Sequence, residues 1–205
     1  MVSQRPVTDN QPEYTESDPE SDASIVLAAR SDLAAFEPLY RRYADRVYRY
    51  CIRRLGDPER ASDATSAIFI KAMQSIESCQ PESFRSWLFS IAHNTTIDAI
   101  RTTRMYDRID GELEMADPGP DPEVAALAAE SRLEIVALLA HLTADQRQVV
   151  ELRLAGLDGY EIASALGRSR ASVDTAQSRA VARLRRVLGV RNPNERREDN
   201  HAAAR

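Results

Sequence analysis

The sequence predicts an all-α protein made of two small helical domains, and three observations carry this prediction. First, apolar residues recur at spacings of three and four across residues 24–104 and 133–188, which is the period of an amphipathic helix rather than a strand. Second, the 205-residue chain has room for two small domains, and its 7 glycines fall below the usual ~7% share, which disfavours β-sandwiches and Gly-rich enzymes. Third, an acidic, Pro-containing stretch separates the two periodic blocks.

Charge is distributed unevenly along the chain. The formal net charge of −5 divides into −5 for residues 1–23, +3 for 24–105, −7 for 106–131 and +4 for 132–205. We therefore expect disordered tails at 1–23 and 190–205, domains at 24–105 and 132–189, and a flexible acidic linker at 106–131. The two basic blocks are compatible with a nucleic-acid partner in spite of an overall pI near 5.3.

Several classes of protein are disfavoured by what the sequence lacks. Lys71 is the only lysine, and neither a P-loop nor a G-x-G-x-x-G motif is present. Cys51 and Cys79 form no C-x-x-C pair, and the three histidines have no metal-ligand spacing, so we expect no cofactor and no metal in a reduced, cytoplasmic protein. The longest apolar run, residues 135–140, is far shorter than the ~20 residues of a membrane span, so we expect no membrane insertion.

The first block predicts four helices, with breaks near residues 31–32, 56–58 and 80–81. In the helix over 32–55, the arginines fall outside a stripe that we expect to be core: Phe36, Leu39, Tyr40, Tyr43, Val47, Tyr50, Cys51 and Leu55. Tyrosine suits a helix face with a wet rim, so these tyrosines indicate packing rather than chemistry.

The next helix has one core face and one face that allows two interpretations. Its core face comprises Ala61, Ala64, Thr65, Ile68, Phe69, Ala72 and Ile76. On the opposite side Asp63, Ser66 and Ile70 align at i, i+3 and i+7, which leaves an apolar residue on a face that otherwise reads as solvated. This pattern fits either an isolated exposed isoleucine or a docking face for a partner.

The fourth helix, over 84–104, carries two stripes. We expect the first to be buried: Phe84, Trp87, Leu88, Ile91 and Thr95. The second stripe ends basic and comprises His93, Asn94, Ile97, Arg101 and Arg104. Arginines near a helix C-terminus fit the helix dipole without any ligand, but Asn and Arg on one stripe also suit phosphates and base edges. His93 alone indicates neither catalysis nor a metal.

The second block contains helix start signals typical of a helix-turn-helix. Thr143–Gln146 and Asp158–Glu161 are capping boxes, Gly167 ends a short helix, and Ser169 caps the next. On that next helix we expect an inward stripe of Val173, Ala176, Ala180, Leu184 and Leu188. The stretch 168–186 holds six arginines against Asp174 alone, which favours binding of duplex phosphates.

Ordered motifs at compatible separations run through both blocks. They are Phe36–Tyr43, Arg46–Tyr50, Ala61–Ala72, Phe84–Asn94, Asp98–Arg104, Leu142–Arg147, Gly156–Ala163 and Leu166–Ser169. With these motifs, residues 24–188 resemble the extracytoplasmic-function sigma factors of bacterial RNA polymerase. The resemblance implies a non-enzymatic specificity subunit of two helical domains, sigma region 2 and sigma region 4. Its expected partners are core RNA polymerase, promoter DNA and an anti-sigma factor, since many members of the family are held inactive by one.

The resemblance also implies roles for particular residues. Asp63, Ser66 and Ile70 are expected to contact the polymerase. The loop Glu77–Ser83 and the fourth helix are expected to capture unstacked bases and backbone of the −10 element, through Ser78, Ser83, Arg85, Asn94, Ile97, Arg101 and Arg104. The helix-turn-helix is expected to read the −35 duplex through Arg168, Arg170, Ser172, Thr175, Gln177, Arg179 and Arg183. The acidic linker is expected to run through the polymerase between the two sites.

Two departures from the family pattern and two other functions stay open at this point. The family often has Glu where this chain has Ser62, and a basic residue where it has Asp174, which either reads a cytosine amino group or lies where the helix turns away. The alternatives are a transcription regulator whose first block senses a ligand or dimerises, and a decoy that binds polymerase or an anti-sigma factor without initiating. A regulator should bind duplex DNA unaided, whereas a decoy should tolerate loss of Arg170 or Arg179.

Overall fold

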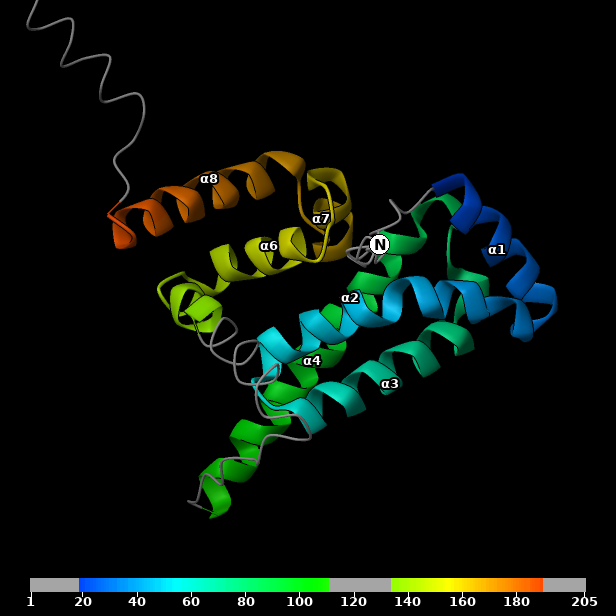
Figure 1. Cartoon of the computed structure of the whole chain (residues 1–205), viewed down its shortest axis with the longest axis horizontal. Helices are drawn as coiled ribbons and strands as arrows, with labels where there is room; N and C mark the ends of the chain where they lie inside the picture. The colour runs from blue at the N-terminus through cyan, green and yellow to red at the C-terminus, as the bar shows by residue number, and fades with distance from the viewer. Residues whose placement is uncertain (1–18, 111–133, 190–205) are drawn as a thin grey trace, which may run out of the picture.

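The computed structural model describes residues 19–110 and 134–189, and every regular element in these two ranges is helical (Figure 1). Residues 1–18, 111–133 and 190–205 lie outside the described residues. Residues 19–23, expected in a disordered tail, are helical because Asp22 is bound by Arg42 and Tyr43, and residues 106–110, expected in the linker, continue the helix that begins at Phe84. The first range contains α1 (Pro19–Ser31), η1 (Leu33–Phe36), α2 (Glu37–Leu55), α3 (Pro58–Gln74), η2 (Ile76–Ser78), η3 (Pro81–Ser83) and α4 (Phe84–Asp110). The second contains helical residues 134–140, α6 (Ala144–Leu154), α7 (Gly159–Leu166) and α8 (Arg170–Val187).

The three breaks expected in the first block are confirmed, and local chemistry explains them. Gly56 ends α2 in the left-handed region at φ 75°, which a residue without Cβ adopts readily. Asp57 then accepts a hydrogen bond from the Arg60 amide, and Pro58 occupies the first turn of α3. At the third break, Gln80 is extended before Pro81, and α4 starts directly after η3.

The core of the N-terminal domain lies between α2, α3 and α4 and is aromatic. Phe36 meets Phe69 and Phe84 edge to face at 6.3 and 6.1 Å. Tyr43 and Tyr50 are fully buried, which confirms that they pack. Tyr40, expected in the same stripe, is 48% exposed, because its ring lies over Phe69 at the rim of the core instead of inside it.

The C-terminal domain has the expected helix-turn-helix. Both capping boxes form, Gly167 adopts φ 61°, and the Ser169 side chain accepts from the Ser172 amide at the start of α8. The inward stripe of α8 is correct at its first three positions, which are buried. Leu188 is wrong: it is 57% exposed, because it is the C-cap residue and lies past the last turn that packs on the domain.

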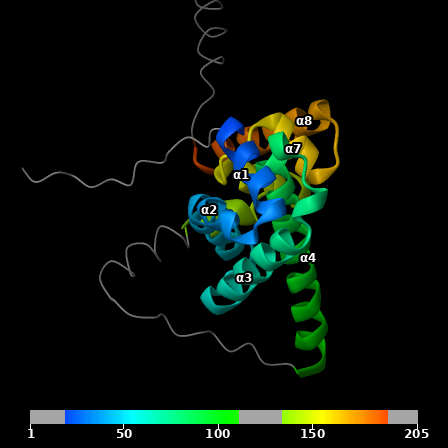
Figure 2. The ribbon, with the colours of Figure 1, turned by 90° about the vertical axis from the view of Figure 1, so that its right-hand side faces the viewer.

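The two domains pack against each other, which the sequence did not predict. α7 lies on α4 and α6 lies on α2, while α8 covers α6 and α7 on the outer side (Figures 1 and 2). Val149, Leu152 and Ile162 belong to the same buried cluster as Tyr50 and the other core residues of the N-terminal domain. The described residues therefore form one closed body with a continuous apolar core.

Candidate functional site

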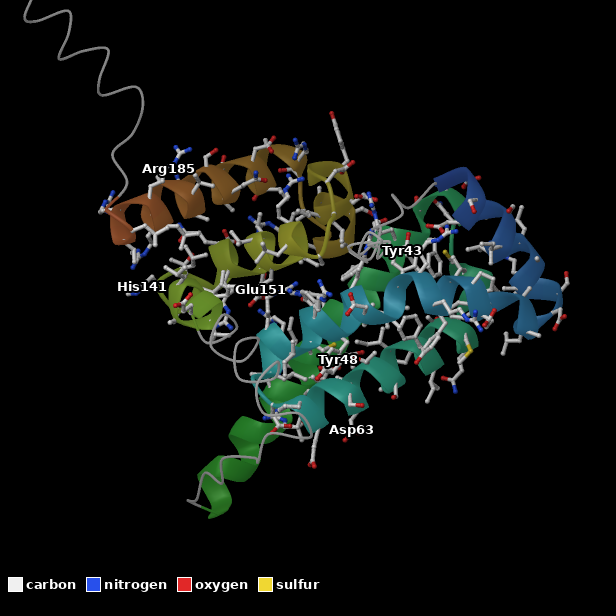
Figure 3. The ribbon with its side chains drawn as sticks, in the orientation of Figure 1. Tyr43, Tyr48, Asp63, His141, Glu151 and Arg185 are labelled. Atoms are coloured by element: carbon white, nitrogen blue, oxygen red, sulfur yellow. The ribbon has the colours of Figure 1, made fainter. Side chains whose placement is uncertain are left out.

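The face of α3 that sequence analysis singled out is exposed. Asp63 and Ser66 are exposed, and Ile70 is 49% exposed one position after the buried Phe69. Asp63 lies on the edge of the molecule opposite α8 (Figure 3). The three residues thus share one accessible face on which Ile70 is an exposed apolar side chain.

The loop between α3 and α4 is anchored by two buried residues and exposes polar side chains to solvent. Ile76 and Cys79 are buried, whereas Glu77, Ser78 and Gln80 are exposed. Ser78 Oγ donates to the carbonyl of Ser75 at 2.7 Å, which turns this hydroxyl toward its own loop. Ser83 is partly buried, and its carbonyl accepts from Ser86 Oγ at 3.0 Å.

The second stripe of α4 is exposed only in part. Asn94 and Arg101 are exposed and Ile97 is half-buried, while the Arg104 side chain lies outside the described residues. His93 is a correction, since it is 8% exposed instead of solvated, with Nδ1 3.2 Å from Tyr50 Oη. Burial, together with the Arg54 charge, lowers the pKa of His93 to about 4. His93 is therefore a neutral core residue, because α4 is packed on more than one side.

Arg85, at the start of α4, is held by the other domain. Its Nε and Nη2 donate to the two carboxylate oxygens of Glu161 on α7 at 2.6 and 2.5 Å. The same Glu161 accepts the Asp158 amide in the α7 capping box. Burial alone lowers the pKa of Arg85, but the hydrogen bonds and charge of Glu161 outweigh it and raise the pKa overall. This bidentate pair links the expected −10 surface to the helix-turn-helix.

A second ionic contact between the domains lies deeper and was missed by sequence reasoning. Glu151 on α6 is fully buried and binds Arg54 of α2 at 2.9 Å and Arg147 of its own helix at 2.7 Å (Figure 3). Arg147 Nη2 also donates to the carbonyl of Arg53 at 3.0 Å. In the sequence, Arg147 and Glu151 look like an ordinary exposed i,i+4 pair, so no local signal could reveal the burial.

Below this contact the domains enclose a cleft of about 720 Å³. Its walls come from α2, α3 and α4 on one side and from residues 140–148 on the other: Arg54, Leu55, Arg60, Ile97, Ile100, Arg101, Ala140, Leu142, Ala144, Arg147 and Gln148. Ile97 and Arg101, which the resemblance assigns to the −10 element, therefore line the same cleft as residues of the C-terminal domain.

α8 carries all of the expected −35 residues except Arg168 and lies on the outer side of the molecule (Figure 1), but four of the seven side chains are held locally, those of Arg168, Arg170, Ser172 and Gln177. Arg168 pairs with Asp145 and donates to Ser172 at 2.7 Å, and Gln177 accepts from Arg153 at 2.8 Å. The remaining polar residues of the set, Thr175, Arg179 and Arg183, are exposed.

Arg170 contacts both α7 and its own helix. Its guanidinium lies 5.0 Å from the Tyr160 ring centre and 2.7 Å from Asp174, one turn further along α8. A Cβ on Gly159 would stand 1.3 Å from Arg170 Nη1, so a glycine at that position lets the side chain lie against the α7 backbone. Asp174 therefore pairs within its own helix, an arrangement that neither sequence interpretation of this residue foresaw.

Among the described residues, no group of three or more His, Cys, Asp and Glu side chains is placed to hold a metal ion. Burial raises the pKa of both thiols, Cys51 and Cys79, to about 11, so they are protonated at neutral pH. In the same part of the chain, no helix is both long and apolar enough to span a bilayer.

Comparison with known proteins places both domains. Residues 39–105 match the family model for sigma-70 region 2, and residues 132–184 match the model for sigma-70 region 4. The chain is 31% identical over 191 residues to the ECF RNA polymerase sigma factor SigE of Mycolicibacterium smegmatis, covering 86% of this chain and 71% of SigE. It is 30% identical over 171 residues to SigL of Mycobacterium tuberculosis, covering 81% of this chain and 96% of SigL.

A longer relative and two solved structures complete the comparison. The ECF sigma factor BldN of Streptomyces coelicolor is 32% identical over 169 residues, 80% of this chain, which spans only 64% of BldN. The structure of CnrH in complex with the cytosolic domain of CnrY has a TM-score of 0.66 at 24% identity and covers 85% of this chain and all of its own. The sigma factor RpoE in complex with the anti-sigma factor NepR from Bartonella quintana has a TM-score of 0.61 at 19% identity, covering 77% and 98% of the two chains. At these identities the two structures show a shared fold.

Proposed function

The chain belongs to the extracytoplasmic-function sigma factors, and from this premise we propose that it binds bacterial core RNA polymerase and directs it to promoters with −35 and −10 elements. The observation that carries the proposal is the pair of distinct accessible surfaces, the α3 face with Ile70 and the arginine-rich outer side of α8, in one chain that matches both sigma regions. It favours initiation over a regulator whose first block senses a ligand.

We propose a role for each surface. Asp63, Ser66 and Ile70 bind the polymerase, and the loop with the exposed stripe of α4 captures the −10 strand. The outer side of α8 binds the −35 duplex, where exposed Arg179 and Arg183 contact phosphates and Thr175 lies within reach of base edges. Residues 24–105 and 132–189 serve as regions 2 and 4, and residues 106–131 join them through the polymerase.

The closed arrangement also bears on the order of events. Arg85 is bound by Glu161, and Ile97 with Arg101 faces residues 140–148, so α4 cannot take up DNA along its whole stripe while the domains are packed. The domains therefore separate when the chain joins polymerase and promoter. An anti-sigma factor is a fitting further partner, because a protein that stabilises the packed form would keep α4 covered.

The test is co-elution of the purified chain with bacterial core polymerase on gel filtration, followed by transcription of random-fragment templates with the bound fraction. Ile70→Asp places a charge in the contact and should weaken binding by about 2 kcal/mol or more, roughly thirtyfold. Leu27→Asp, at a position of similar exposure on α1, is the matched control and should co-elute normally.

Two outcomes would overturn the proposal. The first is tight duplex binding by the free chain with no co-elution, which is the behaviour of a regulator. The second is co-elution without any new start site, which is that of a decoy. Wild-type affinity of Ile70→Asp with normal initiation would instead move the polymerase contact away from α3.

A further inference from the structure

The loop between α3 and α4 packs on the domain core through Ile76 and Cys79, and one long-range hydrogen bond is described for residues 75–83. Its backbone turns through η2 and η3, with the extended residues Cys79 and Gln80 between them. The other hydrogen bonds described for this segment join residues no more than four positions apart, such as Cys79 N to Ile76 O and Ser83 N to Gln80 O. These bonds shape the loop internally but do not fix its position.

The long-range bond comes from α1. Arg30, in the last turn of α1, donates from Nη2 to the carbonyl of Cys79 at 2.5 Å across 49 positions of sequence. A bond from a guanidinium to a carbonyl in a partly buried place is stronger than a neutral one. Because Cys79 is the extended residue at the centre of the loop, Arg30 fixes the point about which η2 and η3 are arranged.

α1 is itself anchored firmly enough to serve as a reference. Near its N-terminus Asp22, 3% exposed, accepts from Arg42 and from the Tyr43 hydroxyl of α2. Along its length Val26 and Ala29 are buried in the domain core, and α1 packs against both η2 and η3. The region 2 family model begins at residue 39, so it assigns no role to this helix.

We propose that α1, through Arg30, positions the loop 75–83 and thereby sets how strictly the chain selects the base captured at the −10 element. This inference rests on the proposed function. Arg30 is a positioning residue: it holds a backbone carbonyl and leaves the exposed Glu77 and Ser78 to meet the DNA. A loop whose position is fixed discriminates between bases better than one that can shift, since a misplaced hydrogen-bonding group accepts several bases nearly equally well.

The experiment compares Arg30→Met, which keeps the aliphatic length but removes every donor, with Arg30→Lys, which keeps a charged donor. Each full-length variant is loaded on core polymerase and assayed on promoters that differ at single −10 positions. For Arg30→Met we expect the preference for the best base over the others to fall roughly tenfold at one position, with polymerase co-elution unchanged. Arg30→Lys should restore part of the preference.

Arg42→Met is the matched control, because it removes an arginine that ties the other end of α1 but leaves the Arg30 bond in place. It should lower thermal stability and keep the base preference. Hydrogen exchange of residues 76–83 in the free chain gives a readout that needs no polymerase: it should speed up in Arg30→Met and not in Arg42→Met. Arg30→Leu, which also lacks a donor, replaces the methionine variant if that variant does not fold.

Unchanged base preference in Arg30→Met, or an equal loss in Arg42→Met, would overturn the proposal. Failure of the wild-type chain to initiate would instead count against the proposed function, and the exchange experiment would still decide whether Arg30 fixes the loop. The two failures are therefore distinguishable.

Discussion

The two expected DNA surfaces of the chain differ in how the rest of the molecule covers them. α8 lies on the side of the C-terminal domain away from the N-terminal domain (Figure 1), and the groups that hold its polar side chains belong to the C-terminal domain itself. On α4 the first arginine is bound by α7, and part of the stripe faces the cleft below α6. The surface expected to bind the −35 element is thus left open by the N-terminal domain, while the surface expected to bind the −10 element is covered in part by the C-terminal domain.

This difference is informative about regulation, because the contact between the domains contains ion pairs beside its apolar core. Arg85 with Glu161 and Arg54 with Glu151 can each exchange their partner for water or a phosphate when the domains separate, which a purely apolar interface could not do as easily. The α4 surface is therefore governed by the domain contact, whereas the α8 surface is governed by pairs inside one domain.

The largest effect is expected from the buried carboxylate that joins the domains. Glu151→Gln leaves Arg54 and Arg147 without their anion inside the molecule, which should cost about 3–5 kcal/mol of unfolding free energy. Urea unfolding followed by circular dichroism reports both domains, while Trp87, the single tryptophan, reports the N-terminal domain alone. The two curves should coincide in the wild type and separate in the variant.

The control for that comparison is Asp45→Asn, which breaks an exposed i,i+4 pair with Arg49 and should change stability by less than about 0.5 kcal/mol. A loss below about 1 kcal/mol in Glu151→Gln would mean that the buried contact contributes little net free energy. The closed state would then rest on the shared apolar core.

His93 on α4 is expected to make the unfolding free energy depend on pH, by about 3 kcal/mol in all. His93 has a pKa of about 4 in the folded chain against 6.5 when exposed, so the unfolded chain binds more protons between these values. Stability should be complete above pH 6.5 and fall as the pH drops toward 4, by about 1.4 kcal/mol per pH unit. Between pH 6.5 and 4 the wild type should lose about 3 kcal/mol more unfolding free energy than His93→Gln, because the glutamine amide stays neutral.

The matched control is His141→Gln, since His141 is exposed in the C-terminal domain (Figure 3). It should leave the pH profile of the wild type unchanged. A profile that is equally steep in His93→Gln would assign the acid sensitivity to carboxylates instead of to the Tyr50–His93 contact.

An intermediate effect is expected from the pair that holds Arg85. Glu161→Gln keeps the capping acceptor but removes the charge, which should release Arg85 at a gain of about 1 kcal/mol, or roughly fivefold, in affinity of the free chain for −10 single-stranded DNA. Fluorescence anisotropy measures it. Glu82→Gln removes an exposed negative charge from the loop 75–83 without touching the Arg85 pair, and it should give a smaller gain in affinity.

The same substitution separates covering from intrinsic affinity. The proposed function separates the domains when the chain binds polymerase, and on that proposal the gain from Glu161→Gln should disappear in the holoenzyme. A fivefold gain that persists in the holoenzyme would show that Glu161 acts by repelling DNA. The domain contact would then not control access to the α4 surface.

Structural features that depend on residues close together in the sequence were predicted, and those that depend on a distant helix were not. Caps, breaks and helix faces follow from neighbouring residues, so the capping boxes at Thr143 and Asp158, the turn at Gly167 and the exposed Ile70 were correctly predicted. The buried Glu151 and His93 were not, because each is buried by a helix from elsewhere in the chain. A periodic pattern tells which faces are apolar, but not which second partner covers a polar one.

The smallest effect is expected on the open surface, at Asp174. Its pair with Arg170 is exposed on both sides and lies within one helix, so it holds the guanidinium by only about 0.2–1 kcal/mol. Asp174→Asn should free Arg170 for a phosphate, tighten holoenzyme binding to the −35 duplex by roughly twofold to fivefold, and steepen its salt dependence by about one counterion.

Removing any acid near DNA also raises affinity, so the gain from Asp174→Asn must be measured both in the wild type and in Arg170→Ala. If the pair restrains Arg170, most of the gain should vanish in the alanine background, because no guanidinium is left to release. An undiminished gain would show that Asp174 acts by its charge alone. Either result tells how Asp174 sets the affinity of the α8 surface for DNA, because both substitutions leave the domain contact around Glu151 and Glu161 intact.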